Sequence, residues 1–362
     1  MRRALRLAVR GLGQVSPRPL TGAVLVRDGR IVGEGACLIN GGESAEVGAL
    51  RQAGNRARGA DLFINIEPGT GKDPGDQSPG QMSAEVLAAA GVCRVFCAVS
   101  DPDPWNRGRW AGRLRRTGVE VEVGMLAAEA AGLNAAYIKH RRSGLPWTVL
   151  KLAQSLDGRI ATRDGDARWI TGPRARAYGH RWRSRLDAVL VGANTVLADD
   201  PRLDVRLVRG RNPVPVVLDG RLRVTPGQRL FTRPGTVLIT SDAHADRRLR
   251  PFVERGARVW RFPARQGRLD LSQVFRRLGR EGFGSLLVEG GGQVAAAVLK
   301  ARLVDRMLVF VAPRLLGEGV AAVGDLDILR VKDSIGLGDG KIRRLGPDLL
   351  YTAEVKYPCS LD

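Results

Sequence analysis

The densest group of residues able to do chemistry is EGGGQVAAAVLKA at 289–301, where an apolar strand ends in a carboxylate and three glycines before a helix begins. Glycines let backbone N–H groups approach an anion closely, and a helix N-terminus adds a dipole that favours negative charge. The pattern is typical of a phosphate-binding loop. It is equally compatible with a purely structural turn, since no GxGxxG with a downstream acidic residue indicates a Rossmann unit.

Three earlier stretches contain further candidates: KLAQSLDGRIA at 151–161, RWITGPRARAYGHRWR at 168–183 and DAVLVGANTVLADDPRLDVR at 187–206. Taken singly, these residues have structural explanations as core aromatics, solvated arginines or a carboxylate that caps a turn. Taken together with EGG, the ordered pattern SLDG, W-I-T-G and V-G-x-x-T-V-L-x-D-D-P-x-L-x-x-R resembles the reductase domain of the bifunctional RibD family. The resemblance implies a dihydrofolate-reductase-like fold for this half.

The resemblance also implies which residues bind each ligand. The expected NADPH contacts are Ala153, Trp169, Thr195, Asp199, Gly291, Gly292, Gln293, Val294, Ala295, Ala296 and Ala297. The expected contacts to a phosphoribosylamino-pyrimidine substrate are Ala167, Arg183, Leu203, Arg206 and Glu289. Ala167 departs from the family pattern, which commonly has a serine there, so one hydroxyl of the expected substrate site is missing.

The reaction implied is hydride delivery from the nicotinamide to C1′ of an opened ribosylamine, which converts the ribosyl group into ribityl. Asp199 is the best-placed carboxylate for a catalytic role near the nicotinamide, and Lys151 could supply a positive charge. The source of the proton stays open at this point, with solvent as one alternative.

The N-terminal half resembles the zinc-dependent deaminase domain of the same family, but the metal ligands have changed. Such deaminases hold zinc with the His of H-x-E and two Cys, and the Glu moves protons for the attacking water. Here the motif reads Ser44-Ala45-Glu46, the first Cys position is Gly69, and the second falls near Gln81 or Ser83. We therefore expect no zinc, a vestigial Glu46 and no deaminase activity.

Several alternatives follow from this loss. One alternative is that the protein performs the same reductase chemistry on the 2,5-diamino pyrimidine or on a related specialised metabolite. A non-catalytic pyrimidine-binding or scaffold protein is another, which loss of the EGG loop would favour. If the deaminase domain is inactive, a separate deaminase is needed for the pathway. The degenerate domain could then bury a face of the reductase domain, support oligomer contacts or bind the pyrimidine without reacting.

The N-terminal elements that must position these residues alternate between strands and helices. Strands are predicted at GAVLVR, GRIVGEG, ADLFINIE, RVFCAVS and VEVEVG, with helices from about Ser44 to Arg58, one ending near Ala90, and one near 126–142. This alternation predicts a cytidine-deaminase-like three-layer α/β/α domain over 1–144. The turn GLPWT at 144–148 marks the domain boundary.

The C-terminal domain, 145–362, is expected to contain a mixed sheet. Its predicted strands are WTVLKLAQ, DAVLVG, VPVVLD, TVLIT, ARVWRF, GSLLVEG, DRMLVFVA and LLYTAEV, with helices near 173–186, 270–280 and 292–302. The last strands follow one another without a helix, which favours antiparallel pairing at that end of an otherwise parallel sheet.

Composition limits the remaining possibilities. The 362 residues have a formal charge of +21, which attracts phosphates, but the arginines are scattered and no nucleic-acid motif concentrates them, so we expect no nucleic-acid partner. No apolar run is long enough for a membrane span or secretory signal, which favours a cytoplasmic protein. The cysteines, Cys37, Cys93, Cys97 and Cys359, form no CxxC pair and are expected to be buried free thiols. A homo-oligomer, dimer or tetramer, is implied by the resemblance.

Overall fold

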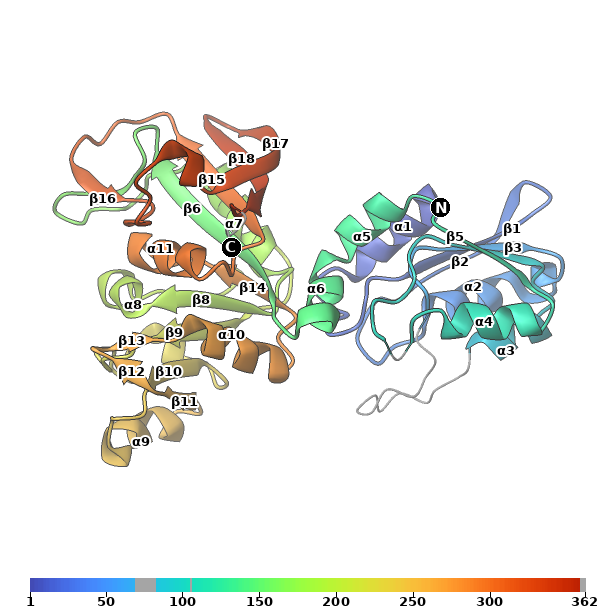
Figure 1. Cartoon of the computed structure of the whole chain (residues 1–362), viewed down its shortest axis with the longest axis horizontal. Coiled ribbons are helices and arrows are strands. Elements are labelled where there is room, and N and C mark those ends of the chain that lie inside the picture. The colour runs from blue at the N-terminus through green and yellow to red at the C-terminus, as the bar shows by residue number, and fades with distance from the viewer. Residues whose placement is uncertain (69–82, 105, 359–362) are drawn as a thin grey trace. The chain divides into compact units, whose positions relative to one another are not determined.

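The computed structural model describes residues 1–68, 83–104 and 106–358. The chain forms two compact units, Met1–Gly144 and Leu145–Asp362 (Figure 1). Each unit has its own sheet and its own buried clusters of apolar side chains.

The N-terminal unit is built on a five-stranded sheet in the order β2-β1-β3-β4-β5. The strands are β1 (Gly22–Arg27), β2 (Arg30–Ala36), β3 (Asp61–Ile64), β4 (Arg94–Cys97) and β5 (Glu120–Val123). β1 pairs antiparallel with β2 and β3, whereas β3, β4 and β5 are parallel. The parallel strands require helical crossovers, and this is why helices lie between them in the chain.

Helices cover both faces of this sheet, as a three-layer arrangement requires. One face packs on α2 (Ala45–Ala53), α3 (Ser83–Ala89) and α4 (Arg109–Arg116), and the other on α1 (Arg2–Ala8) through Ala4 and Leu7. Gly35 of β2 allows α2 to lie very close, because a Cβ there would meet the Ala45 carbonyl oxygen at 2.0 Å. This close packing holds the start of α2, and with it Glu46, against the sheet.

The structure corrects the N-terminal prediction at three places. The single helix predicted near 126–142 is two helices, α5 (Ala127–Leu133) and α6 (Ala135–Ser143), separated at Asn134. The buried Asn134 amide accepts from the Leu20 N–H at 2.8 Å and donates to the Leu20 carbonyl at 3.0 Å, a long-range contact that local pattern does not reveal. Helices α1 and α4 were not predicted. Cys93 is exposed because it precedes β4, whereas Cys37 and Cys97 are buried free thiols as predicted, and Cys359 lies outside the described residues.

The C-terminal unit contains a nine-stranded sheet in the order β11-β10-β9-β8-β14-β6-β15-β18-β17. The strands are β6 (Trp147–Ser155), β8 (Ala188–Gly192), β9 (Val214–Leu218), β10 (Val237–Ser241), β11 (Arg258–Phe262), β14 (Ser285–Val288), β15 (Arg306–Ala312), β17 (Gly336–Leu345) and β18 (Asp348–Lys356). Pairing is parallel from β11 to β15 and antiparallel for β15–β18 and β18–β17, so the predicted mixed sheet is confirmed. Two small ladders, β7 (Arg159–Thr162) with β16 (Gly319–Ala321) and β12 (Ala264–Arg265) with β13 (Arg268–Leu269), lie outside it.

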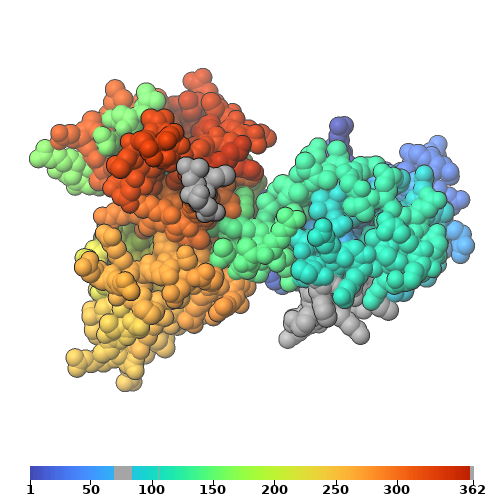
Figure 2. Space-filling view, in the orientation of Figure 1, coloured from blue at the N-terminus to red at the C-terminus, as the bar shows by residue number. Residues whose placement is uncertain are grey.

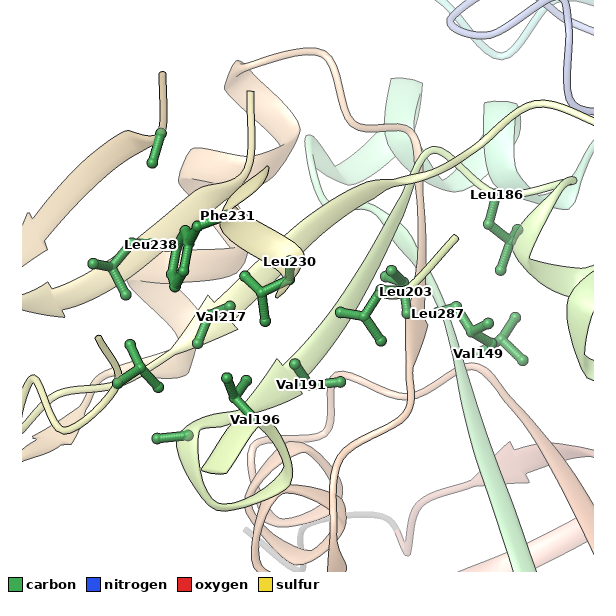
Figure 3. Close-up of a cluster of buried hydrophobic side chains, with 14 of the residues drawn as sticks. Val149, Leu186, Val191, Val196, Leu203, Val217, Leu230, Phe231, Leu238 and Leu287 are labelled. Carbon is green, nitrogen blue, oxygen red and sulfur yellow. The ribbon is translucent and has the colours of Figure 1, made fainter. Parts of the chain in front are cut away.

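Both faces of the parallel strands are buried. On β8, Val189 and Val191 face one apolar cluster, shown in part in Figure 3, while Ala188 and Leu190 face the other. This explains why the strand is apolar throughout rather than alternating with polar residues. Helices α7 (Pro173–Arg183), α8 (Ala193–Asp199) and α9 (Asp246–Glu254) contribute to the first cluster, and α10 (Leu271–Arg280) and α11 (Gly292–Lys300) to the second.

Strand β17 ends the sheet. Nearly all of its residues are exposed, and the last part of the chain, red in Figure 2, lies at the surface of this unit. Its sequence, GLGDGKIRRL, has no apolar alternation, and it was not predicted. Among the described residues, no helix has the length and apolar composition that spanning a bilayer requires.

Candidate functional site

Three neighbouring parallel strands bring the candidate residues to one edge of the C-terminal sheet. β14 pairs with β6 through Val288 and Leu150 and with β8 through Val288 and Leu190, so β14 and β8 end close to the same level, whereas β6 continues beside β15 to Ser155. Glu289 and the glycines follow β14, α8 follows β8, and Ala153 lies near the end of β6. The carboxyl edge of a parallel sheet is where ligands bind in open α/β folds.

The glycine loop forms an open helix start. Helix α11 begins at Gly292 with Gly291 as its N-cap, and the N–H groups of Gly292 and Gln293 have no hydrogen-bond acceptor among the described residues. A Cβ on Gly292 would meet the Ala321 carbonyl oxygen at 2.4 Å, so this glycine is required by packing. A Cβ on Gly291 would find nothing nearer than Ile160 Cδ1 at 3.9 Å and Thr195 Oγ1 at 4.0 Å. A Cβ at Gly291 would therefore fit in ordinary van der Waals contact with Ile160 and Thr195, at a helix start whose first N–H groups and dipole favour an anion.

The other expected cofactor residues surround this loop at different depths. Thr195 of α8 lies within 4.0 Å of the Gly291 Cβ position, and Val294 packs against Gly290 and Gly192. Ala295 and Ala296 face the apolar core, so only their backbone is close to the loop, while Ala297 is exposed. Ala153 is partly buried on β6.

Two expected cofactor residues, Trp169 and Asp199, each lie beside an arginine. Trp169 is 56% exposed, and the Arg176 guanidinium lies 4.3 Å from the centre of its ring. The Arg168 guanidinium donates to the Asp199 carbonyl oxygen at 2.8 Å and lies 3.6 Å from the Asp199 carboxylate. Arg168 thus lies beside both the backbone carbonyl and the carboxylate of Asp199.

A buried cluster of charges lies where β14 ends, beside the middle of β6. The Arg183 guanidinium donates to both Glu289 oxygens, at 2.7 and 2.8 Å, and Lys151 Nζ lies 3.8 Å from Glu289 Oε2. Burial alone would raise the pKa of Glu289, but the Arg183 and Lys151 charges outweigh it and hold this pKa at about 2. Burial lowers the pKa of Lys151, and the Glu289 carboxylate opposes that shift. A carboxylate and two cations are therefore fixed together next to the glycine loop.

The loop after α8 is tied to this cluster. Arg183 Nη1 donates to the Asp204 carbonyl oxygen at 3.1 Å, and Arg206 Nη1 donates to the Asp204 carboxylate at 2.7 Å. The buried ring of His180 accepts the Arg206 N–H at Nδ1 at 3.2 Å. Leu203, with φ at +51°, packs into the core and anchors the loop. No described interaction joins Ala167 to this group.

Sequence reasoning missed His180 and Asp204. His180 lies three residues before Arg183 on α7, a spacing that places both side chains on one face of the helix, and this was the available signal. Asp204 follows Leu203 within the motif but was not assigned a role. Burial, followed by the Arg183 and Arg206 charges, lowers the pKa of His180 to about 4, so its ring is neutral at pH 7.

Replacing His180 by phenylalanine should weaken substrate binding and lower the free energy of unfolding by about 1–3 kcal/mol. The reason is that the backbone N–H of Arg206 would lose its acceptor. Replacing it by asparagine keeps an acceptor near the position of Nδ1 and should preserve binding. The pKa of His180 is lower in the folded protein, about 4, than its ordinary value of 6.5. The neutral His180 ring therefore contributes its full stabilisation above pH 6.5, and this contribution is lost as the pH falls towards 4. Urea unfolding at pH 7 and 4.5 should therefore show a smaller pH effect in H180N than in the unsubstituted protein. An equal pH effect in both would contradict this role.

In the N-terminal unit, Ser44 caps α2 without a side-chain hydrogen bond, and Glu46 in the first turn is 3% exposed. Burial raises the pKa of the Cys37 thiol, the Arg18 charge opposes this, and the Glu46 carboxylate adds to it, so both charged groups act on Cys37. The predicted ligand positions Gly69 and Gln81 lie outside the described residues, and Ser83 begins α3. No group of three or more His, Cys, Asp or Glu suited to a metal occurs in the part of the chain that the structure describes.

The chain is similar to known proteins over almost its whole length. A family model described as the RibD C-terminal domain matches residues 146–351. The riboflavin biosynthesis protein RibD of Escherichia coli is 37% identical over 365 residues, with 96% of each chain covered. That of Aquifex aeolicus is 35% identical, with 97% of this chain and 96% of the relative covered.

Solved structures agree with these relatives. Acinetobacter baumannii RibD superposes with a TM-score of 0.88 at 31% identity, covering 98% of this chain and 97% of the other. A Thermotoga maritima protein, described as a diaminohydroxyphosphoribosylaminopyrimidine deaminase/5-amino-6-(5-phosphoribosylamino)uracil reductase, superposes with a TM-score of 0.84 at 30% identity, covering 99% and 97%. The expected pair of a deaminase-like and a dihydrofolate-reductase-like domain is confirmed. The chain therefore belongs to the RibD family of riboflavin biosynthesis proteins.

Proposed function

We propose that this protein is an NADPH-dependent reductase that converts the ribosyl group of 5-amino-6-(5-phosphoribosylamino)uracil into ribityl, and that its deaminase activity is lost. The main support is the juxtaposition at the carboxyl end of β14, between β6 and β8. There an open helix start at Gly291 lies one residue beyond Gly290 and two beyond Glu289, the centre of the buried charge cluster. A cofactor diphosphate and a polar substrate would thus meet at adjacent positions.

The loop suits the diphosphate of a dinucleotide. Two N–H groups at the start of α11, those of Gly292 and Gln293, have no acceptor among the described residues, and the helix dipole favours an anion beside them. When bound, NADPH supplies the hydride that reduces C1′ of the opened ribosylamine. The protein's part is to hold the two ligands in register and to exclude other reactions.

The charge cluster suits the substrate. Two guanidinium nitrogens of Arg183, Nε and Nη2, donate to the two carboxylate oxygens of Glu289. Arg183 therefore holds that carboxylate in place rather than binding the substrate phosphate. Arg206 has a side chain that is 48% exposed and presents the remaining guanidinium N–H groups to a phosphate. Lys151 approaches Glu289 only to 3.8 Å, beyond a hydrogen bond, so its N–H groups can contact the sugar oxygen that gains a proton.

The loss of deaminase activity rests on the ligand positions. Ser44 replaces the histidine, and neither Gly69 nor Gln81 or Ser83 offers a soft ligand, so no residue set in the motif fits zinc. Without a metal-bound hydroxide, Glu46 has no activated water to assist. A separate deaminase would then supply the substrate.

The test supplies the purified protein with NADPH and either the aminated or the deaminated phosphoribosylamino pyrimidine, and follows absorbance at 340 nm, ammonia release and zinc content. We expect NADPH oxidation with the deaminated compound alone, no ammonia, and no zinc. Oxidation with the aminated compound would place reduction before deamination. Ammonia release that depends on zinc would refute the loss of the deaminase, and no oxidation with either compound would refute the reductase assignment.

A further inference from the structure

Asp157, in the turn between β6 and β7, holds a distant part of the chain through its carboxylate. Its Oδ2 accepts the N–H of Gly317 at 2.7 Å and that of Leu316 at 3.1 Å. The hydroxyl of Ser155, a fully buried residue at the end of β6, donates to Oδ1. This hydrogen bond fixes the direction of the carboxylate and lowers the pKa of Asp157. The two backbone N–H groups are therefore bound by a charged acceptor, which makes both hydrogen bonds strong.

The part of the chain that Asp157 holds connects the end of β15 to the glycine loop; we call it the 313–324 segment. It contains β16, which pairs antiparallel with β7 through Val320 and Ala161. Beyond β16, the Ala322 N–H donates to the Gly158 carbonyl oxygen at 3.0 Å. The segment is thus bound to the β6–β7 turn and to β7 at several points, and Asp157 provides the first of them.

The far end of this segment packs on the start of α11. The Gly324 N–H donates to the Gly292 carbonyl oxygen at 2.9 Å, and a Cβ on Gly292 would meet the Ala321 carbonyl oxygen at 2.4 Å. From β7, Ile160 Cδ1 lies 3.9 Å from the Cβ position of Gly291. Both strands of the small ladder therefore contact the helix start, β16 at Gly292 and β7 at Gly291.

The ladder itself can contribute little to holding this arrangement. β7 has four residues and β16 three, and their register shifts between Val320 and Ala321. Leu315 is 74% exposed and Val320 45% exposed, so little apolar surface is buried along the segment. A short two-stranded ladder outside the main sheet is marginally stable by itself. The polar contacts of Asp157 are then the strongest attachment near the beginning of the segment.

We propose that Asp157 is a positioning residue of the reductase. Its carboxylate fixes the 313–324 segment against the β6–β7 turn, and β16 and β7 then hold the start of α11 in the arrangement that binds the cofactor. This rests on the proposed function, because it takes that helix start as the site of the cofactor diphosphate. Asp157 itself contacts no ligand. When only a fraction of the molecules has the binding-competent arrangement, the apparent affinity is reduced by that fraction, so loosening the segment weakens cofactor binding.

Asp270 provides a matched control. It is the N-cap of α10, and its Oδ1 accepts the N–H groups of Ser272 at 2.9 Å and Gln273 at 3.3 Å. Replacing Asp157 or Asp270 by alanine therefore removes the same kind of group, an exposed carboxylate that accepts two backbone N–H groups. None of the hydrogen bonds of Asp270 among the described residues reaches the helix start. Asp157→Asn is the conservative variant, because its amide oxygen can still accept from Leu316 and Gly317.

The first measurement is hydrogen–deuterium exchange, followed by mass spectrometry, in the full-length protein without cofactor. In D157A, faster exchange at Leu316 and Gly317 follows directly from the lost acceptor. The proposal requires more, namely faster exchange at Ala322 and Gly324, which keep their own carbonyl acceptors. D270A should leave both of these N–H groups as protected as in the unsubstituted protein.

The second measurement is the Kd for NADP⁺ by titration calorimetry, together with KM and kcat for NADPH. In D157A the Kd should rise roughly 10-fold or more, the size expected for lost charge-assisted hydrogen bonds, and less than about 2-fold in D157N and D270A. KM should rise with Kd, while kcat at saturating NADPH should stay within about 3-fold, because bound cofactor restores the arrangement. Saturating NADP⁺ should likewise restore the protection of Ala322 and Gly324 in D157A.

Unchanged protection of Ala322 and Gly324 in D157A, faster exchange there without a weaker Kd, or an equal loss of affinity in D270A would overturn the proposal. If D157A failed to fold, S155A, which removes only the hydroxyl that orients the carboxylate, would have to show the same two changes to a smaller extent. NADP⁺ binding without reduction of either pyrimidine would refute the proposed reaction alone. Unchanged NADP⁺ affinity in D157A would refute this inference alone.

Discussion

Replacing Arg183 by methionine is expected to reduce reductase activity roughly 100-fold or more and to destabilise the C-terminal unit by about 3–5 kcal/mol. The Arg183 side chain is 14% exposed and that of Glu289 9% exposed, and the two form a forked pair. Methionine fills a similar volume but leaves the carboxylate with Lys151 alone, at 3.8 Å. A buried charge without an adequate partner costs far more than the intact pair contributes.

The pH dependence separates this explanation from a simple loss of packing. In the unsubstituted protein the pKa of Glu289 is about 2, so the stability it contributes is present above the ordinary value near 4.5 and is lost only as the pH falls towards 2. Without Arg183, burial should raise that pKa, and protonation would then remove the uncompensated charge. The difference in unfolding free energy between R183M and the unsubstituted protein should therefore shrink as the pH falls from 7 to 4.

A matched control is Arg250→Met, which removes an arginine from a pair with Glu254 at 2.8 Å, where both side chains are exposed, 80% and 59%. Loss of an exposed pair should cost less than about 1 kcal/mol and leave activity intact. Denaturant unfolding at several pH values and the NADPH assay measure both effects. A destabilisation of R183M that stayed constant between pH 4 and 7 would show that Glu289 is not left with an unpaired charge.

The strands of the C-terminal sheet could be predicted because their burial on both faces leaves uninterrupted apolar runs such as those of β8 and β14. Helix α8 was not predicted as a separate element, because it follows β8 directly at Gly192 with no turn residues between them. β17 was missed because an exposed edge strand has no apolar pattern to detect. In this sheet, local pattern therefore identified the buried strands but missed the edge strand and the short helix, whose exposure or boundary gives no contrast.

The site shows the same division. The glycine loop was predicted from its own residues, since glycines before a helix have a local physical meaning. The ion cluster could not be, because Lys151, Arg183 and Glu289 come from β6, α7 and the end of β14, and only the parallel register brings them together. The family resemblance named Arg183 and Glu289 as substrate residues, whereas the structure adds that they bind each other.

Replacing Gly291 by alanine is expected to abolish measurable cofactor binding while leaving the protein folded. Gly291 has φ at −68°, a value that alanine adopts without strain, and the added Cβ would lie 3.9 Å from its nearest described neighbour. The protein itself therefore does not require glycine at this position. The methyl group would instead occupy the space in front of the free N–H groups, and a diphosphate could not approach them closely enough to accept hydrogen bonds.

Gly292→Ala is the matched control, because Gly292 is required by packing within the protein rather than by cofactor binding. A Cβ there would lie 2.4 Å from the Ala321 carbonyl oxygen, and Gly324 N donates to the Gly292 carbonyl oxygen at 2.9 Å, so the backbone at 321–324 would have to move. We expect G292A to lose about 1–3 kcal/mol of stability and G291A less than about 0.5 kcal/mol. Thermal unfolding without cofactor and calorimetric titration with NADP⁺ measure the two effects separately. If G291A bound the cofactor normally, the space beside Gly291 would not be the diphosphate site. If G291A unfolded as readily as G292A, both glycines would be structural, and the start of α11 would not be the centre of the reductase site.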